Sequence, residues 1–235
     1  GTSARACAIR YICDRDWPMK ENEAVLENGV IAGNYYNKYA SGNPVVKAMM
    51  NGFHGAVEDL LRKSGVHEIH EVGCGEGQLA MHVARLGYTV RASDYSAEIT
   101  ARAQESARAD NLNIQFFQRS VYELNEEDAA PLIMCCEVLE HLTAPEQALE
   151  AVAKRCSPYA LYSVPREPAW CMLNMLRGKY WRSWGNTPGH LQHWSSRGVV
   201  TLLQKYFDLV EVRRPFPWTI ALCRARGFGG DAKPI

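Results

Sequence analysis

The amino-acid sequence predicts an α/β fold, in which helices cover both faces of a seven-stranded, mostly parallel sheet. Three observations support this fold class. Strand and helix patterns alternate along most of the chain, and parallel strands need such crossover helices. A glycine-rich turn joins the strand at 68–72 to a helix at once. The next strand ends in an acid, Asp94, where open α/β sheets bind nucleosides.

The first strand, Glu68–Val72, runs into Gly73, Gly75 and Gly77, and apolar residues of the following helix then recur on one face. Glycine lets the backbone turn sharply and lets a ligand approach closely. The dinucleotide fingerprint G-x-G-x-x-G requires a third glycine where this chain has Gln78. The spacing therefore disfavours a nicotinamide-dependent oxidoreductase, which stays the alternative enzyme class.

The remaining elements follow in order along the chain. Strands are expected at 88–93, 114–117, 132–136, 160–164, 209–212 and 218–222, the last two as a closing hairpin. Helices are expected at 44–61, 97–110 and 195–207. Pro44 suits a first helical turn, and Ser96 suits an N-cap. The segment Cys156–Tyr159 is interpreted as the turn before the fifth strand.

Two motifs resemble those of a known family. The G-x-G-x-G turn after Glu71 resembles motif I of the class I S-adenosylmethionine (SAM)-dependent methyltransferases. The segment Glu137–Leu142, after the fourth strand, resembles that of the ubiquinone O-methyltransferase type, and the likeness extends over residues 50–225. The resemblance implies a Rossmann-like sheet with an antiparallel edge strand and SAM as cofactor. The chain departs from the family pattern at Ser120, where many members have an Asp for the adenine amine.

The resemblance implies a cofactor site along the strand ends. Asp94 is placed to accept both ribose hydroxyls, and SAM lacks a pyrophosphate, so no anion site is needed. The residues expected to contact SAM are Tyr36, Glu71, Gly73, Cys74, Gly75, Gly77, Asp94, Tyr95, Ser120, Val121 and Glu137.

An aromatic-rich insertion at 166–194 follows the fifth strand, where family members cover their substrate. Aromatic walls suit a flat or apolar acceptor, and nearby bases would allow an anionic group on it. Tyrosines before the first helix are further candidates. The residues expected to contact the acceptor are Tyr35, Tyr39, Arg166, Trp170, Trp181 and Trp184.

Methyl transfer from a sulfonium requires alignment and exclusion of water, and a hydroxyl acceptor also benefits from a general base. Histidine suits that role at neutral pH. The candidates are His141, His190 and His193. An amine or an activated carbon acceptor needs no base, so methylation of O, N or C stays open, and O or N is expected. No cluster shows metal-ligand spacing in the sequence, and no metal is expected.

The composition of the chain limits the kinds of partner that are expected. The formal net charge is +0, which argues against a nucleic-acid partner, and no apolar run is long enough to span a membrane. The eight cysteines show no C-x-x-C spacing and suit reduced thiols in the cytoplasm. The expected partner is a small-molecule methyl acceptor, and the oligomeric state stays open.

The chain is expected to divide into three parts: an N-terminal extension and lid at 1–45, a methyltransferase domain at 46–226 that includes the insertion, and a tail at 227–235. A non-catalytic SAM-binding module is the third function class, and a turnover assay separates it from an enzyme.

Overall fold

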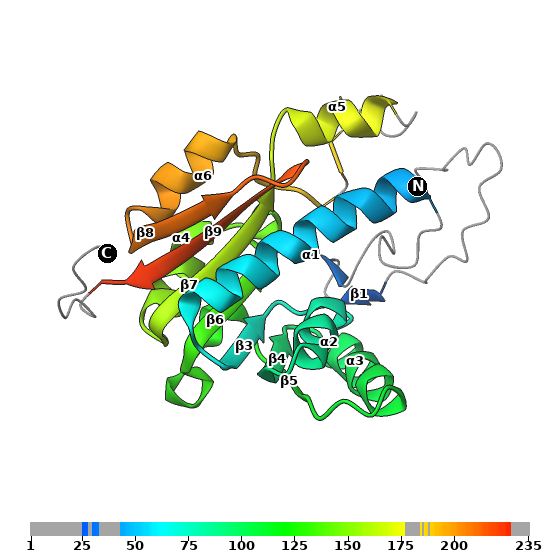
Figure 1. Ribbon diagram of the computed structural model, residues 1–235, viewed down its shortest axis with the longest axis vertical. Coiled ribbons are helices and arrows are strands. Elements are labelled where there is room, and N and C mark those ends of the chain that lie inside the picture. Colours follow the sequence, from blue (N-terminus) through cyan, green and yellow to red (C-terminus); the bar gives the residue numbers. More distant parts are fainter. Residues whose placement is uncertain are drawn as a thin grey trace, which may run out of the picture.

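A computed structural model describes the backbone of residues 25–27 and 30–32, and residues 43–176, 184, 186, 187 and 189–226 (Figure 1). Its main sheet has seven strands in the order β5-β4-β3-β6-β7-β9-β8. The strands are β3 (Glu68–Val72), β4 (Thr89–Asp94), β5 (Gln115–Gln118), β6 (Ala130–Cys136), β7 (Cys156–Pro165), β8 (Phe207–Arg213) and β9 (Trp218–Ala225). This confirms the predicted seven-stranded, mostly parallel fold.

The antiparallel strand is β9, which pairs with β7 on one side and with β8 on the other. The expected antiparallel element is therefore present, but it lies one position in from the edge, and β8 is the edge strand. A short hairpin of β1 (Val25–Glu27) and β2 (Val30–Ala32) forms a separate two-stranded sheet that the sequence did not predict.

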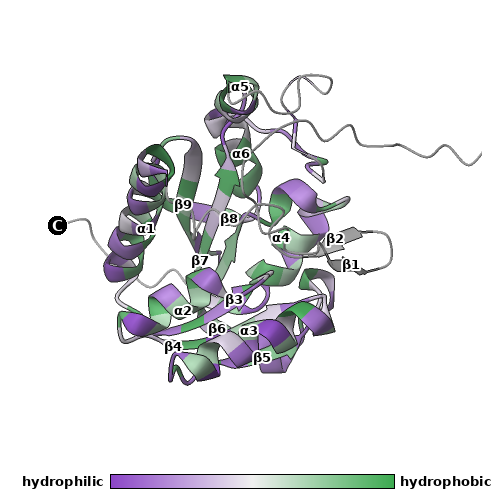
Figure 2. Cartoon of the chain, turned by 90° about the vertical axis from the view of Figure 1, so that its right-hand side faces the viewer, coloured by the Kyte–Doolittle hydropathy of each residue, from purple (hydrophilic) through white to green (hydrophobic). Residues whose placement is uncertain are grey.

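Helices cover both faces of the sheet, as expected. They are α1 (Pro44–Ser64), α2 (Gln78–Arg85), α3 (Ala97–Ala109), α4 (Pro145–Ala153), α5 (Ala169–Leu176) and α6 (Ser196–Leu203). The described residues also form three single 3-10 turns, η1 (Val121–Glu123) and η2 (Glu126–Asp128) between β5 and β6, and η3 (Leu139–His141) before α4. Figure 2 shows α1 and α4 on opposite sides of the strands. None of the described helices is long and apolar enough to cross a bilayer.

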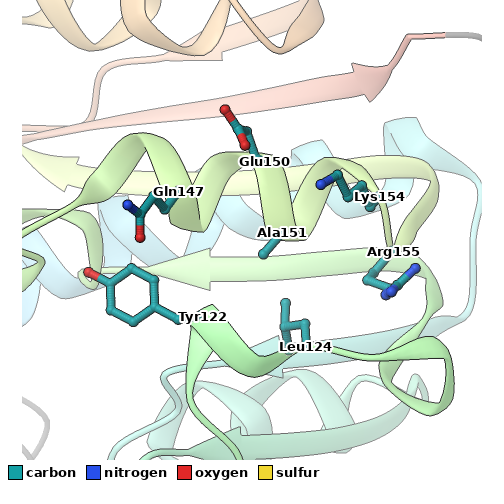
Figure 3. A pocket seen from close by; sticks show the side chains of 7 residues that line it. All are labelled: Tyr122, Leu124, Gln147, Glu150, Ala151, Lys154 and Arg155. Atoms are coloured by element: carbon teal, nitrogen blue, oxygen red, sulfur yellow. The ribbon is translucent and has the colours of Figure 1, made fainter.

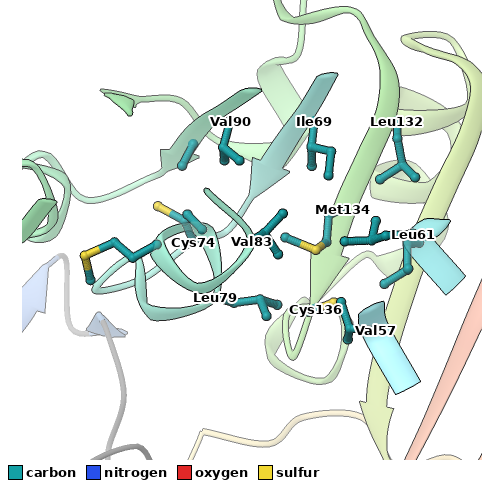
Figure 4. Packing of buried hydrophobic residues seen from close by; sticks show 14 of the residues in the cluster. Val57, Leu61, Ile69, Cys74, Leu79, Val83, Val90, Leu132, Met134 and Cys136 are labelled. Carbon is teal, nitrogen blue, oxygen red and sulfur yellow. The ribbon is translucent and has the colours of Figure 1, made fainter. Parts of the chain in front are cut away.

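Alternation along the central strand β6 builds two cores. Leu132, Met134 and Cys136 face the side of α1 and α2, in the cluster seen in Figure 4. Ile133 and Cys135 face the side of α4 and α6. Successive strand side chains point to opposite faces, so a strand buried on both sides must be apolar throughout. The sheet is thus held rigidly between two helical layers, and its strand ends can position a site.

Helix ends follow the capping chemistry of the sequence. Asn43 Oδ1 accepts from Val45 N at 2.9 Å at the start of α1, and Pro44 stands in the first turn. Ser96 Oγ accepts from Ile99 N at 3.3 Å and begins α3 as predicted.

Two element predictions were wrong in extent. The segment Cys156–Tyr159 is the first part of β7 instead of a turn, and its register opposite Ala130 and Leu132 is irregular. Such irregularity admits a proline in a strand. The helix expected to reach residue 207 ends at Leu203, and Phe207 begins β8. The predicted extension at 1–45 and tail at 227–235 fall largely outside the described residues.

Candidate functional site

The glycine turn after β3 is held against the end of β4. The backbone N–H groups of Gly73 and Cys74 both donate to the carbonyl of Ser93, at 2.7 and 3.0 Å. Gly73 has φ +75°, and a Cβ added there would lie 2.4 Å from Val138 Cγ2. Glycine at this position is therefore required by the left-handed backbone and by the packing of Val138. The turn thereby touches the segment that follows β6.

Asp94 ends β4 directly beside this turn. Its Oδ2 accepts from Gly75 N at 2.9 Å, and its Oδ1 accepts from Ser96 N at 3.1 Å. The side chain is buried. Each carboxylate oxygen has a second lone pair, so the carboxylate can still accept ribose hydroxyls while it holds the turn. Asp94 thus has a structural role in addition to the predicted contact with SAM.

Glu71 lies in β3 below the same turn and is buried. Burial raises the pKa of its carboxyl to about 8, an effect that the backbone N–H of Ala80 opposes and the nearby Asp94 adds to. Within the described part of the chain, Glu71 Oε2 has no hydrogen-bond partner. The carboxyl is therefore mostly protonated at neutral pH and can donate a hydrogen bond.

The other predicted cofactor residues also lie at strand ends. Glu137 has φ +58°, and its carboxylate accepts from Ser163 Oγ at 3.0 Å and from Trp218 Nε1 at 2.8 Å. It ties the ends of β6, β7 and β9 together. Ser120 Oγ caps η1 by accepting from Tyr122 N at 3.3 Å.

Three more residues predicted to contact the cofactor have side chains or backbone groups engaged within the protein. Val121 is buried, and the side chain of Cys74 belongs to the apolar cluster under α2, so only the backbone of Cys74 faces the turn. The carbonyl of Tyr95 accepts from Gln118 Nε2 at 2.9 Å. Tyr36 lies outside the described residues.

Two of the three candidate histidines come together. His141 in η3 and His190 of the insertion have ring centroids 4.9 Å apart and meet edge to face. His141 Nδ1 lies 2.9 Å from the carbonyl of Gly189. A carbonyl only accepts, so Nδ1 holds the proton of the neutral ring, and Nε2 has the lone pair. That tautomer suits a proton acceptor or a metal ligand.

Glu140 completes this group. Its side chain is buried, and ligand atoms of Glu140, His141 and His190 all lie within 4.8 Å of one another. Two histidines and a carboxylate form a donor set that can hold a divalent cation. The expectation of no metal rested on spacing along the sequence. Spacing could not reveal this group, because the fold brings its members together from segments nearly fifty residues apart.

The insertion is anchored to η3 by its backbone. The N–H groups of Leu191 and Gln192 both donate to the carbonyl of Glu140, at 2.8 and 3.0 Å. Trp170 in α5 stacks on His190 with 6.2 Å between centroids, and its Nε1 donates to Thr187 Oγ1 at 2.9 Å. The insertion therefore lies against the histidine pair from one side and Trp170 packs on His190, while His141 stays exposed.

The remaining predicted acceptor residues differ in placement. The guanidinium of Arg166 lies 5.9 Å from the centroid of the Phe216 ring. Trp184 is 83% exposed, so its ring forms no wall with described residues. Tyr35, Tyr39 and Trp181 lie outside the described residues.

His193, the third candidate, does not join the pair. It groups instead with Glu167 and Cys171, near the base of the insertion. Sequence reasoning identified neither Glu167 nor Cys171 as part of a site.

A surface hollow of about 250 Å³ lies between η1 and α4 (Figure 3). Its wall contains Tyr122, Leu124, Gln147, Glu150, Ala151, Lys154 and Arg155. None of these is a predicted site residue. The glycine turn and the histidine pair mark the candidate site more directly.

Comparisons with known proteins identify similar domains and folds. Residues 69–159 match a family described as "Methyltransferase domain". A ubiquinone biosynthesis O-methyltransferase from Rickettsia akari is 32% identical over 91 residues, which cover 39% of this chain and 36% of that protein. One of the same name from Caulobacter is 34% identical over 96 residues, covering 40% and 38%. The chain thus spans well under half the length of these curated relatives.

Solved structures show the same fold. Magnesium protoporphyrin IX methyltransferase from Synechocystis PCC 6803, with bound S-adenosylhomocysteine, has a TM-score of 0.61 at 19% identity, over 80% of this chain and 90% of that one. An N-methyltransferase from Bradyrhizobium japonicum has a TM-score of 0.56 at 19% identity, over 75% and 96%. Residues 69–159 are thus similar to a methyltransferase domain, and the whole sheet has the fold of solved SAM-dependent methyltransferases.

Proposed function

We propose that this chain transfers the methyl group of SAM to a hydroxyl oxygen of a small, anionic acceptor. The observation that supports the oxygen is the group formed by Glu140, His141 and His190 at the carboxyl edge of the sheet. Val138, which packs on the glycine turn, stands only three residues before His141. The predicted cofactor turn and the proton acceptor are therefore neighbours.

The proposed step is an in-line substitution. The acceptor oxygen forms a bond to the methyl carbon as the carbon–sulfur bond breaks, and S-adenosylhomocysteine leaves. His141 Nε2 takes the hydroxyl proton, since Nδ1 is committed to the Gly189 carbonyl. Trp170, whose Nε1 is held by Thr187, packs on His190 at one side of the reacting atoms. An amine acceptor, the alternative, would need no such base.

An anionic group on the acceptor is supported by Arg166, directly after β7. Among the described residues no carboxylate forms an ion pair with it, and its guanidinium is stacked near Phe216. A partly buried cation at the edge of the site suits a carboxylate or phosphate. Phe216, 49% exposed, offers an aromatic surface beside it.

A divalent cation fits the same three donor groups. When bound there, it would polarise the acceptor hydroxyl and lower its pKa. Activity that is lost on chelation and restored by Mg²⁺ or Mn²⁺ would assign His141 and His190 as ligands. Activity that is insensitive to chelation would assign His141 as the base itself.

The test is a methylation screen over phenols, hydroxy acids and amines, read out as S-adenosylhomocysteine formed. His141→Asn should lower kcat by about 10²–10⁴-fold with unchanged SAM affinity by calorimetry. His67→Asn, at an exposed histidine before β3, is the matched control and should keep full turnover. Turnover by His141→Asn at the wild-type rate, or acceptance of amines alone, would contradict the proposal. No turnover with any acceptor would favour a SAM-binding module. The cytoplasmic location and the lack of a nucleic-acid partner stay predictions.

A further inference from the structure

A second group of metal-ligand residues lies outside the histidine pair. Glu167 follows β7, Cys171 stands one helical turn later in α5, and His193 precedes α6. One ligand atom from each, a carboxylate oxygen, Sγ and a ring nitrogen, lies within 4.8 Å of the other two. The three come from both ends of the 166–194 insertion.

The local contacts already hold the first ligand in place. Glu167 Oε2 accepts from the backbone N–H of Cys171 at 3.2 Å, and Glu167 Oε1 lies 3.5 Å from His193 Nδ1. The side chain is only 13% exposed. Oε1 is shielded from solvent and makes no hydrogen bond within the described part of the chain. A buried carboxylate oxygen of this kind gains from a cation.

The backbone brings the outer two ligands together independently of their side chains. The N–H of Glu167 donates to the carbonyl of Trp194 at 2.9 Å, directly after His193. The first and last residues of the insertion therefore lie side by side. An ion bound between Glu167 and His193 would close the loop of more than twenty residues between them.

The donor set indicates which ion. A thiolate, an imidazole and a carboxylate are the ligands of zinc, and three protein ligands leave a fourth position for water. Mg²⁺ and Ca²⁺ prefer oxygen alone. We propose that Glu167, Cys171 and His193 bind Zn²⁺ and that this ion fastens the two ends of the insertion together. The Cys171 proton leaves to solvent as the zinc–sulfur bond forms. This inference does not depend on methyl transfer.

The experiment uses Co²⁺ as a spectroscopic substitute for Zn²⁺. The full chain, reduced and freed of metal, is titrated with Co²⁺ while the near-ultraviolet thiolate-to-cobalt absorption is recorded. The wild-type protein should show this band at one equivalent, and Zn²⁺ should remove it by displacement. Cys171→Ser should abolish the band, and His193→Gln should weaken Co²⁺ binding by at least about tenfold. His190→Gln should keep the band, because the other group has no thiol.

Zinc should also raise the midpoint of thermal unfolding of the wild type and leave that of Cys171→Ser unchanged. An unchanged far-ultraviolet circular dichroism spectrum in each variant shows that it is folded, which is expected for His193→Gln because the His193 side chain is 39% exposed. A wild-type protein without the thiolate band overturns the proposal. So does a band of full strength in Cys171→Ser, since the thiol ligand would then be another cysteine.

Discussion

Replacing Gly73 by alanine tests whether the glycine turn is required by packing as well as by the backbone. The backbone has φ +75°, where an L-residue costs roughly 1–2 kcal/mol. The added Cβ would lie 2.4 Å from Val138 Cγ2 and 3.2 Å from Cγ1, and such overpacking costs about 1–3 kcal/mol. Gly73→Ala should therefore lower the free energy of unfolding by roughly 2–5 kcal/mol.

Gly65→Ala is the matched control. Gly65 has nearly the same φ, +69°, at the end of α1, and an added Cβ there would meet nothing within 4 Å. The free energy of unfolding of this variant should fall only by the cost of the left-handed backbone, roughly 1–2 kcal/mol. The difference between the two variants isolates the contact with Val138.

Urea unfolding followed by circular dichroism gives the free energies. A double-mutant cycle with Val138→Ala should show a coupling energy of about 1–3 kcal/mol, because the smaller side chain removes the clash. Equal losses in Gly73→Ala and Gly65→Ala, or a coupling energy of zero, would refute the reasoning. The turn would then move aside at little cost.

Three further predictions concern α1 and the two acids of the site. Gly55→Ala, inside α1 with no atom within 4 Å of the new Cβ, should stabilise the protein by about 0.5–1 kcal/mol in urea unfolding; destabilisation would mean that the helix is distorted there. Asp94→Asn should weaken SAM binding by about 1–3 kcal/mol in calorimetry, since it removes a charged acceptor beside Gly75 N; unchanged affinity would place the ribose elsewhere. The folded-state pKa of Glu71, about 8, is raised above its ordinary value of 4.5. Its contribution to the free energy of unfolding is therefore complete below pH 4.5 and is lost as the pH rises through 8. Glu71→Gln should flatten this dependence of the free energy of unfolding on pH. An identical pH profile of unfolding in wild type and variant would show that Glu71 ionises normally.

Much of the sheet could be predicted because apolar runs mark its strands in the sequence and glycines mark the turn after the first of them. The strand Glu68–Val72 was predicted with its observed bounds, and β4 and β5 to within a residue or so at each end. The start of β7 was missed because Ser157 and Pro158 are typical turn residues. Pairing with β6 overrides that local preference, and no periodicity in the sequence announces it.

The candidate site was predictable only where it is local in the chain. Asp94 and the glycines lie beside strands, so position along the chain implied position in space. The partners of His141 and His193 depend on how the insertion folds back. Nothing in its tryptophan-rich sequence distinguishes contact with Glu140 from contact with Glu167.

The insertion is attached to the rest of the domain through backbone hydrogen bonds, and this has an evolutionary consequence. Glu167 N meets the Trp194 carbonyl, and the Glu140 carbonyl receives Leu191 N and Gln192 N, so backbone atoms make these attachments. Side chains between such points can change without removing these backbone attachments to the sheet. Under the proposed function, acceptor preference would then change by exchange of this span alone, while the strand ends around the glycine turn stay the same.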